Sequence, residues 1–145
     1  MVTVRQILKD KGSQVWSVEP TAMVYSALQL MADKEIGALL VLAEGMLVGI
    51  FSERDYARKV ILHGKTSAET RVSEVMSPDV VTVGAEQSIA ECMALMTEKR
   101  FRHLPVVEGG QILGVISIGD VVKAIITDQQ FVIEQLESYI SGRRS

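Results

Sequence analysis

Gly49-Ile50-Phe51-Ser52-Glu53-Arg54-Asp55 is followed 65 residues later by Gly114-Val115-Ile116-Ser117-Ile118-Gly119-Asp120, and both stretches read Gly-x-x-Ser-x-x-Asp. The match continues backwards at the same offset as far as Val15 and Val80. Before that point the offset is 68, so the first copy carries a short insertion around residues 9–14. The residues that align at this second offset are Val4, Ile7 and Leu8 with Val72, Val75 and Met76. A repeat of this length predicts one structural unit used twice.

Both copies predict the same order of elements. A short helix comes first, then a short strand, an amphipathic helix, two strands joined by a Gly-containing turn, and a closing helix that Ser52 or Ser117 can cap. A half of roughly 60 residues buries too little surface to be robust alone. We therefore expect an α+β (α/β) fold of two β-α-β-β-α repeats packed about a pseudo-twofold axis. The predicted strands are 15–18, 38–42 and 46–51 in the first repeat, and 80–83, 104–107 and 112–117 in the second.

The expected boundaries follow the repeats. The first repeat takes residues 1–65, a small polar linker residues 66–70, and the second repeat residues 71–127. Residues 128–145 form a C-terminal helix and tail, because Phe131, Ile133, Leu136 and Ile140 have amphipathic helical spacing. We expect this helix to dock on the body of the protein or on a partner chain.

Composition excludes several classes of function. Apolar residues make up 48% of the chain and the net charge is −3, which does not favour nucleic-acid binding. No apolar run approaches the ~20 residues of a membrane span. The single cysteine, Cys92, rules out an intramolecular disulfide and fits a cytoplasmic location. Together with two histidines, it is too sparse to predict a metal site.

The repeated motif has two interpretations. A serine at a helix N-terminus lies where free backbone N–H groups favour a phosphate. The aspartate three residues later is a natural acceptor for a ribose diol. Ser-x-x-Asp also resembles a capping box, with Asp in place of Glu. One copy alone favours the cap, whereas two copies at matching points favour a nucleotide site.

The repeat, the element order and the motif, together with Arg102-His103-Leu104-Pro105-Val106, resemble the cystathionine β-synthase (CBS) domain. The resemblance runs from Val4 to about Ile126 and is closest to short bacterial proteins that consist of one CBS pair, or Bateman module. It implies that an adenosyl ligand (AMP, ADP, ATP, an NAD-type dinucleotide or S-adenosylmethionine) occupies two clefts between the repeats. It also implies a homodimer.

The resemblance carries roles over to individual residues. Asp120 and Asp55 would hold ribose, and Ser117 and Ser52 phosphate. Arg102 and His103 align with Gly37 and Ala38, so the second cleft has cations that the first lacks, and Arg54 would supply charge in the first. Whether His103 contacts ligand or is an inert core histidine stays open. The residues expected around adenine are Ser17, Val18, Gly37 and Ala38 in one cleft, and Thr82, Val83, His103, Leu104 and Pro105 in the other.

No nucleophile–base constellation is visible, so we expect no catalysis and no catalytic residue. A nucleotide sensor is the leading hypothesis. The alternative is a structural or protein-interaction module with degenerate clefts and an unidentified protein target, and a small hydrolase or transferase ranks third. Homodimerisation is also expected because the chain has more apolar helix faces than it can easily bury. These faces are Ala27, Leu28 and Met31; Cys92, Met93 and Met96; and Val121, Val122, Ile125 and Ile126.

Overall fold

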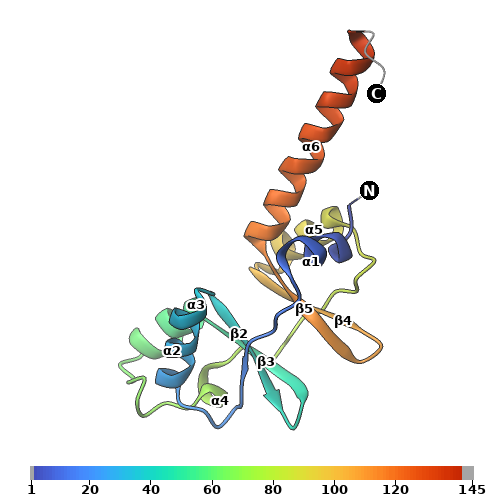
Figure 1. Ribbon diagram of the computed structural model, residues 1–145. Coiled ribbons are helices and arrows are strands. Elements are labelled where there is room, and N and C mark those ends of the chain that lie inside the picture. Colours follow the sequence, from blue (N-terminus) through green and yellow to red (C-terminus); the bar gives the residue numbers. More distant parts are fainter. Residues whose placement is uncertain (1, 142–145) are drawn as a thin grey trace. The chain divides into compact units, whose positions relative to one another are not determined.

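The computed structural model describes residues 2–141, and each of its two units is built around one β-hairpin (Figure 1). In one, β2 (Ala38–Ala43) pairs antiparallel with β3 (Met46–Ser52); in the other, β4 (His103–Glu108) pairs with β5 (Gln111–Ser117). The two turn residues of each hairpin have positive φ, which is the conformation of a type I′ turn. These four predicted strands are confirmed.

The amphipathic helices are α2 (Val24–Lys34) and α5 (Ile89–Lys99). Each buries three residues spaced three and four apart, as the periodicity predicts. Both end at a residue in the left-handed conformation, Glu35 and Arg100. The first strand of each repeat is shorter than predicted. It is two residues in β1 (Ser17–Val18), which pairs parallel with β2, and an isolated bridge from Val83 to Val106 in the second repeat.

The leading helices are exchanged between the repeats. One compact unit is Val15–Val81, and the other consists of the first fourteen residues and the chain from Thr82 onwards. Consequently α1 (Val4–Lys11) belongs with the second repeat and α4 (Val72–Val75) with the first. The compact units therefore do not coincide with the repeat boundaries at 1–65 and 71–127.

Glycines on the hairpins let these helices approach closely. A Cβ added to Gly114 would lie 2.7 Å from Leu8 Cδ2, and one on Gly49 would lie 2.7 Å from Met76 Sδ. Leu8 and Met76 are the residues that align at the offset of 68. The same helix-on-strand contact is thus made in both units, and it explains why both motifs begin with glycine.

Residues 66–70 are packed on their unit, although they lie between the repeats in sequence. The Thr70 carbonyl accepts a hydrogen bond from Val24 N at 2.8 Å, and the Ser67 carbonyl accepts one from Tyr25 N at 3.0 Å. Thr70 is buried. This segment satisfies two of the free N–H groups at the start of α2.

The closing helices differ between the repeats. In the first, α3 (Glu53–Asp55) continues as a π-helical turn, η1 (Tyr56–Ile61). In the second, α6 (Ile118–Ile140) is one continuous helix. The predicted C-terminal helix is thus present, but it is continuous with the closing helix of the second repeat rather than a separate element. The periodicity after Thr127 belongs to α6, and its apolar side chains are exposed. Met1 and residues 142–145 of the predicted tail lie outside the described residues.

The helix faces expected at a dimer interface are mostly used by the chain itself. Ala27, Met31, Cys92, Met96 and Val121 are each at most 4% exposed. Each closes the core of its own unit, so none of them is available to a partner. Val122 and Ile126 on α6 remain exposed.

Candidate functional site

Both Ser-x-x-Asp motifs form complete capping boxes. In the first, Ser52 N donates to Asp55 Oδ2 at 2.9 Å, and Asp55 N donates to Ser52 Oγ at 3.2 Å. In the second, Ser117 N donates to Asp120 Oδ2 at 2.8 Å, and Asp120 N donates to Ser117 Oγ at 3.2 Å. The capping interpretation is confirmed. It leaves the nucleotide interpretation open, because a cap needs only one carboxylate oxygen.

Asp55 uses both of its oxygens within its own unit. Besides the cap, Oδ2 accepts from Ser52 Oγ at 3.0 Å. Its other oxygen, Oδ1, accepts from Ser77 Oγ at 3.0 Å and lies 3.1 Å from Lys59 Nζ. The residue is only 7% exposed. A ribose hydroxyl would have to displace one of these donors.

Asp120 is arranged differently. Its side chain is 22% exposed, and Lys11 Nζ from α1 lies 2.6 Å from Oδ2. The hydrogen bonds from Lys11 Nζ and Ser117 N both end on Oδ2. Burial alone would raise the pKa of Asp120, but Lys11 and Ser117 outweigh it and hold that pKa below its usual value. Asp120 is therefore an ionised acceptor at neutral pH.

His103 adjoins the same corner of the unit. It is the cross-strand partner of Ser117, and Ile118 N donates to the Arg102 carbonyl at 2.8 Å. Burial lowers the pKa of His103, Lys11 and Arg102 lower it further, and Asp120 opposes them. The imidazole is thus neutral at pH 7 and can gain a proton when an anion arrives.

The structure brings together most of the predicted residues of the second motif. Arg102, His103, Ser117 and Asp120 lie at the junction of β4, β5 and α6. Leu104, Pro105 and Val83 are buried in the unit, so they offer no exposed side chain to a ligand. Thr82 is exposed.

The residues of the first motif lie in the other unit. Ala38 is the cross-strand partner of Ser52, and Glu53 N donates to the Gly37 carbonyl at 3.1 Å. This contact is equivalent to the one between Ile118 and Arg102. Ser17 is exposed, and Val18, Arg54 and Gly37 are half-buried.

Lys11 is the site residue that sequence reasoning missed. It lies in the insertion that breaks the repeat register, where the sequence Lys11-Gly12-Ser13 predicts a turn rather than a functional side chain. Lys11 Nζ also donates to the Val115 carbonyl at 3.0 Å. In the other unit Ser77, which follows the exchanged helix α4, makes the corresponding contact with Asp55. One feature of the sequence does point to Lys11: the leading segments of the two repeats align at an offset of 68, whereas the rest of the repeats align at 65.

A pocket of about 430 Å³ opens beside Lys11 and Asp120, between α1 and α6. It mixes polar and apolar side chains, as small-molecule sites do. Its lining includes Gln6, Ile7, Asp10, Lys123, Thr127 and Phe131.

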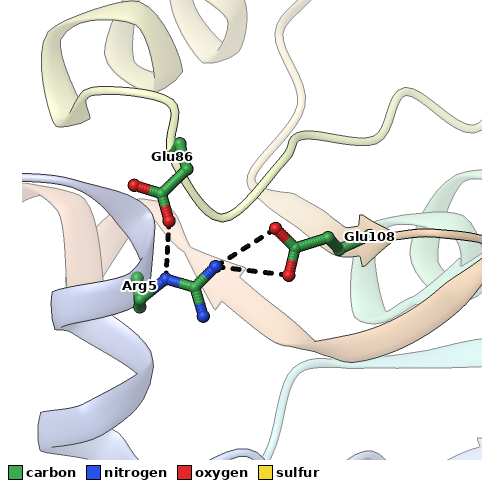
Figure 2. A network of polar contacts seen from close by, with 3 residues as sticks. All are labelled: Arg5, Glu86 and Glu108. Atoms are coloured by element: carbon green, nitrogen blue, oxygen red, sulfur yellow. Dashed lines mark hydrogen bonds and ion pairs between the residues drawn. The ribbon is translucent and has the colours of Figure 1, made fainter.

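The helix that carries Lys11 is tied to its unit at its other end. Figure 2 shows Arg5 between two carboxylates of the second repeat. Arg5 Nε donates to Glu86 Oε1 at 2.6 Å, and its Nη2 contacts both oxygens of Glu108 at 3.1 and 3.2 Å. Because all three side chains are exposed, these ion pairs contribute little to the stability of the fold.

Two related hairpin-and-helix units, each with a capped Ser-x-x-Asp junction, define a module of two tandem repeats. The CBS domain model matches residues 4–62 and 72–127, so this chain belongs to the CBS-domain family and carries two copies of the domain. This finding confirms the resemblance and the fold class.

The chain is similar to several known CBS proteins. It is 36% identical to the CBS domain-containing protein CBSX3, mitochondrial, of Arabidopsis thaliana, over 97% of this chain and 72% of that protein. A solved CBS-domain protein from Burkholderia ambifaria is 53% identical, with a TM-score of 0.85 over 88% of this chain and 96% of that one. The CBS domain pair of MJ0100, in complex with 5′-methylthioadenosine and S-adenosylmethionine, has a TM-score of 0.77 at 18% identity, over 88% of this chain and 98% of that one. The last likeness concerns the fold alone.

Two further findings bear on partners. No helix in residues 2–141 combines the length and the apolar character needed to cross a membrane. Among the same residues, no group of three or more His, Cys, Asp or Glu side chains is placed to hold a metal ion.

Proposed function

We propose that the chain is a regulatory module that binds an adenine nucleotide, such as AMP, ADP, ATP or an NAD-type dinucleotide, without transforming it. The better of its two sites is built on Ser117, Asp120 and Lys11. The observation that carries the proposal is the partly exposed carboxylate of Asp120, whose Oδ2 caps α6 and pairs with Lys11. Its Oδ1 would take the ribose hydroxyls.

Phosphate recognition follows from the charges around this carboxylate. Lys11, Arg102 and a His103 that gains a proton supply cations near the N-terminus of α6, whose free N–H groups also favour an anion. A phosphate would draw Lys11 away from Asp120, so ligand binding exchanges one ion pair for another. Because protonated His103 is the form that attracts phosphate, affinity should rise as the pH falls from 8 to 6.

The site around Asp55 is the weaker one in this proposal. Both of its oxygens are occupied, and Gly37 and Ala38 stand where the second repeat has Arg102 and His103. Arg54 is the cation available to this site. An adenosyl ligand without phosphates would be less affected by this difference than ATP.

The cellular setting completes the proposal. We expect the protein to act in the cytoplasm as a homodimer, to have no nucleic-acid or membrane partner, and to pass its ligand state to a protein target. AMP and ATP should compete for one site and leave the module in different shapes, because phosphate number sets how far Lys11 and Arg102 must move. Identical small-angle scattering and amide-exchange profiles with AMP and ATP would contradict the proposal that the two nucleotides leave the module in different shapes.

Thermal shift with AMP, ATP, NAD and S-adenosylmethionine tests ligand binding. A ligand at a hundred times its Kd should stabilise the fold by about 2.7 kcal/mol. The matched variants are Asp120→Asn and Asp55→Asn, which remove one charge from each motif. We expect Asp120→Asn to weaken the tighter site by roughly 1–3 kcal/mol and Asp55→Asn to leave it nearly unchanged. An equal or larger loss with Asp55→Asn contradicts the ranking of the sites.

Lys11→Met tests the phosphate role separately. This substitution should weaken the binding of ATP more than the binding of adenosine, because adenosine lacks the phosphates that Lys11 attracts. If both ligands lose affinity equally, Lys11 only positions α1. Mass spectrometry of nucleotide that co-purifies with the protein would identify the ligand, and a protein without any stabilising adenosyl compound would favour a pure interaction module.

A further inference from the structure

The pocket between α1 and α6 extends well beyond the residues assigned to the nucleotide. It lies within one unit, and its volume of about 430 Å³ falls in the range of small-molecule sites. On α6 its lining runs from Asp120 to Phe131, which are 11 residues or about 16 Å apart. A mononucleotide held by Asp120 therefore leaves the part of the pocket near Phe131 unfilled.

The pocket lies on a different side of Asp120 from the residues expected around adenine. Among residues 2–141, none of those expected around adenine in this unit lines the pocket. Ribose separates the base of a nucleotide from its phosphates. A nucleotide whose ribose binds Asp120 and whose base lies toward β4 therefore directs its phosphates toward Lys11 and into the pocket.

The lining on α6 changes in character with distance from Asp120. Lys123 comes first and adds a second cation to that of Lys11. Asp128 follows, and its carboxylate can accept hydrogen bonds from a ribose diol. Phe131 comes last and offers an aromatic ring that is 59% exposed. The order along the helix is thus cation, carboxylate, aromatic ring.

This order does not suit ATP. Beyond its first two phosphates ATP has only another phosphate, which would meet the carboxylates of Asp10 and Asp128. Like charges at short range in a partly enclosed pocket repel one another. The apolar side chains of Ile7 and Phe131 would gain no contact from a phosphate. A third phosphate is therefore disfavoured in this pocket.

The same order suits the second half of a dinucleotide. Its two phosphates are followed by a ribose, whose hydroxyls can donate to Asp128, and then by a flat ring that can stack on Phe131. The oxidised nicotinamide ring carries a positive charge. Such a ring is attracted by an aromatic face and by the nearby carboxylates, whereas the reduced ring is neutral.

We propose that the pocket between α1 and α6 holds the second nucleoside of an oxidised nicotinamide dinucleotide. Lys11 and Lys123 contact its two phosphates, Asp128 the second ribose, and Phe131 the nicotinamide ring. This inference rests on the proposed function, because Asp120 holds the ribose of the first nucleoside. The module then distinguishes the oxidised from the reduced dinucleotide by the charge of the ring.

The first experiment compares AMP, ATP, NAD⁺ and NADH on the full chain by isothermal titration calorimetry. NAD⁺ should bind about tenfold more tightly than AMP, because the second nucleoside adds a stacked ring. NADH should bind about threefold more weakly than NAD⁺, because its ring lacks the positive charge. The four compounds share the adenosine that Asp120 would hold, so these differences report on the pocket.

Phe131→Ala tests the far end of the pocket. It should raise the Kd of NAD⁺ about tenfold and leave the Kd of AMP unchanged, because AMP does not reach this ring. Circular dichroism should show an unchanged fold, since Phe131 belongs to no core. Tyr139→Ala is the matched control. It removes an aromatic side chain from the same helix that is 85% exposed and does not line the pocket, so both Kd values should stay at the wild-type level.

Asp128→Asn should change the binding of NAD⁺ and of ATP in opposite directions. Loss of the charged acceptor should raise the Kd of NAD⁺ about threefold to tenfold. Loss of the repulsion should lower the Kd of ATP. Glu134→Gln is the matched control, because Glu134 is an exposed carboxylate on α6 that does not line the pocket, and it should alter neither Kd.

The results separate this inference from the proposed function. If AMP binds and NAD⁺ binds no more tightly, the second nucleoside gains nothing from the pocket and this inference alone is overturned. The same holds if Phe131→Ala weakens AMP and NAD⁺ equally, or if Asp128→Asn weakens ATP as much as NAD⁺. If none of the four compounds binds, the proposed function is overturned and this inference with it.

Discussion

Replacing each motif aspartate with asparagine should affect stability in the opposite order to ligand binding. Asp55 is 7% exposed and has four polar contacts, with Ser52 N, Ser52 Oγ, Ser77 Oγ and Lys59 Nζ. An amide keeps one acceptor oxygen and places an NH₂ group against donors that faced the other. Hydrogen bonds to a charged group contribute about 1.5–3 kcal/mol each, so we expect Asp55→Asn to cost about 2–3 kcal/mol.

Asp120→Asn should cost less. Its amide oxygen still accepts from Ser117 N and keeps the cap, so the main loss is the ion pair with Lys11. The Lys11 side chain is 39% exposed, and such pairs contribute about 1 kcal/mol or less. At about 3 °C per kcal/mol for a chain of this size, Asp55→Asn should melt roughly 3–9 °C below Asp120→Asn.

Urea and thermal unfolding without ligand measure this order directly. A ligand-free Asp120→Asn protein that is the less stable of the two would refute the argument from buried contacts. Ser77→Ala is the control, because it removes one donor to Asp55 and leaves the charge in place. Ser77→Ala should lower the free energy of unfolding by about 1 kcal/mol, which is less than the loss expected for Asp55→Asn.

Gly49→Ala and Gly114→Ala should each lower the free energy of unfolding by about 1–3 kcal/mol, because the added Cβ would lie 2.7 Å from the side chain of the exchanged helix. Chemical denaturation checks this, and the double variant Gly114→Ala with Leu8→Ala should be more stable than Leu8→Ala alone if the clash is the cause. Stability should also fall as the pH drops below about 6.5. Burial lowers the pKa of His103, so in that range the unfolded chain binds a proton that the folded chain does not. Urea melts between pH 5 and 8 should show this slope in wild type and less of it in His103→Gln, and equal slopes would mean that other groups are responsible.

The sequence by itself determined the repeat, four of the strands, the two amphipathic helices and both capped junctions. These features are local: strand and helix periodicity, Gly in tight turns, and a serine followed by an aspartate at a helix start are all read within a few residues. The sequence also predicts both roles of Ser-x-x-Asp, as a capping box and as a nucleotide site.

Only the tertiary structure decided which residues complete each junction. Sequence similarity assigns α1 to the first repeat, but the lack of a side chain at Gly114 lets Leu8 and its helix pack on the hairpin of the second. That exchange brings Lys11 to Asp120 and makes the two aspartates unequal. In the same way, helical periodicity places an apolar face beyond Thr127 but does not say whether the chain covers it. The structure leaves that face exposed because the cores of both units are already closed by shorter helices.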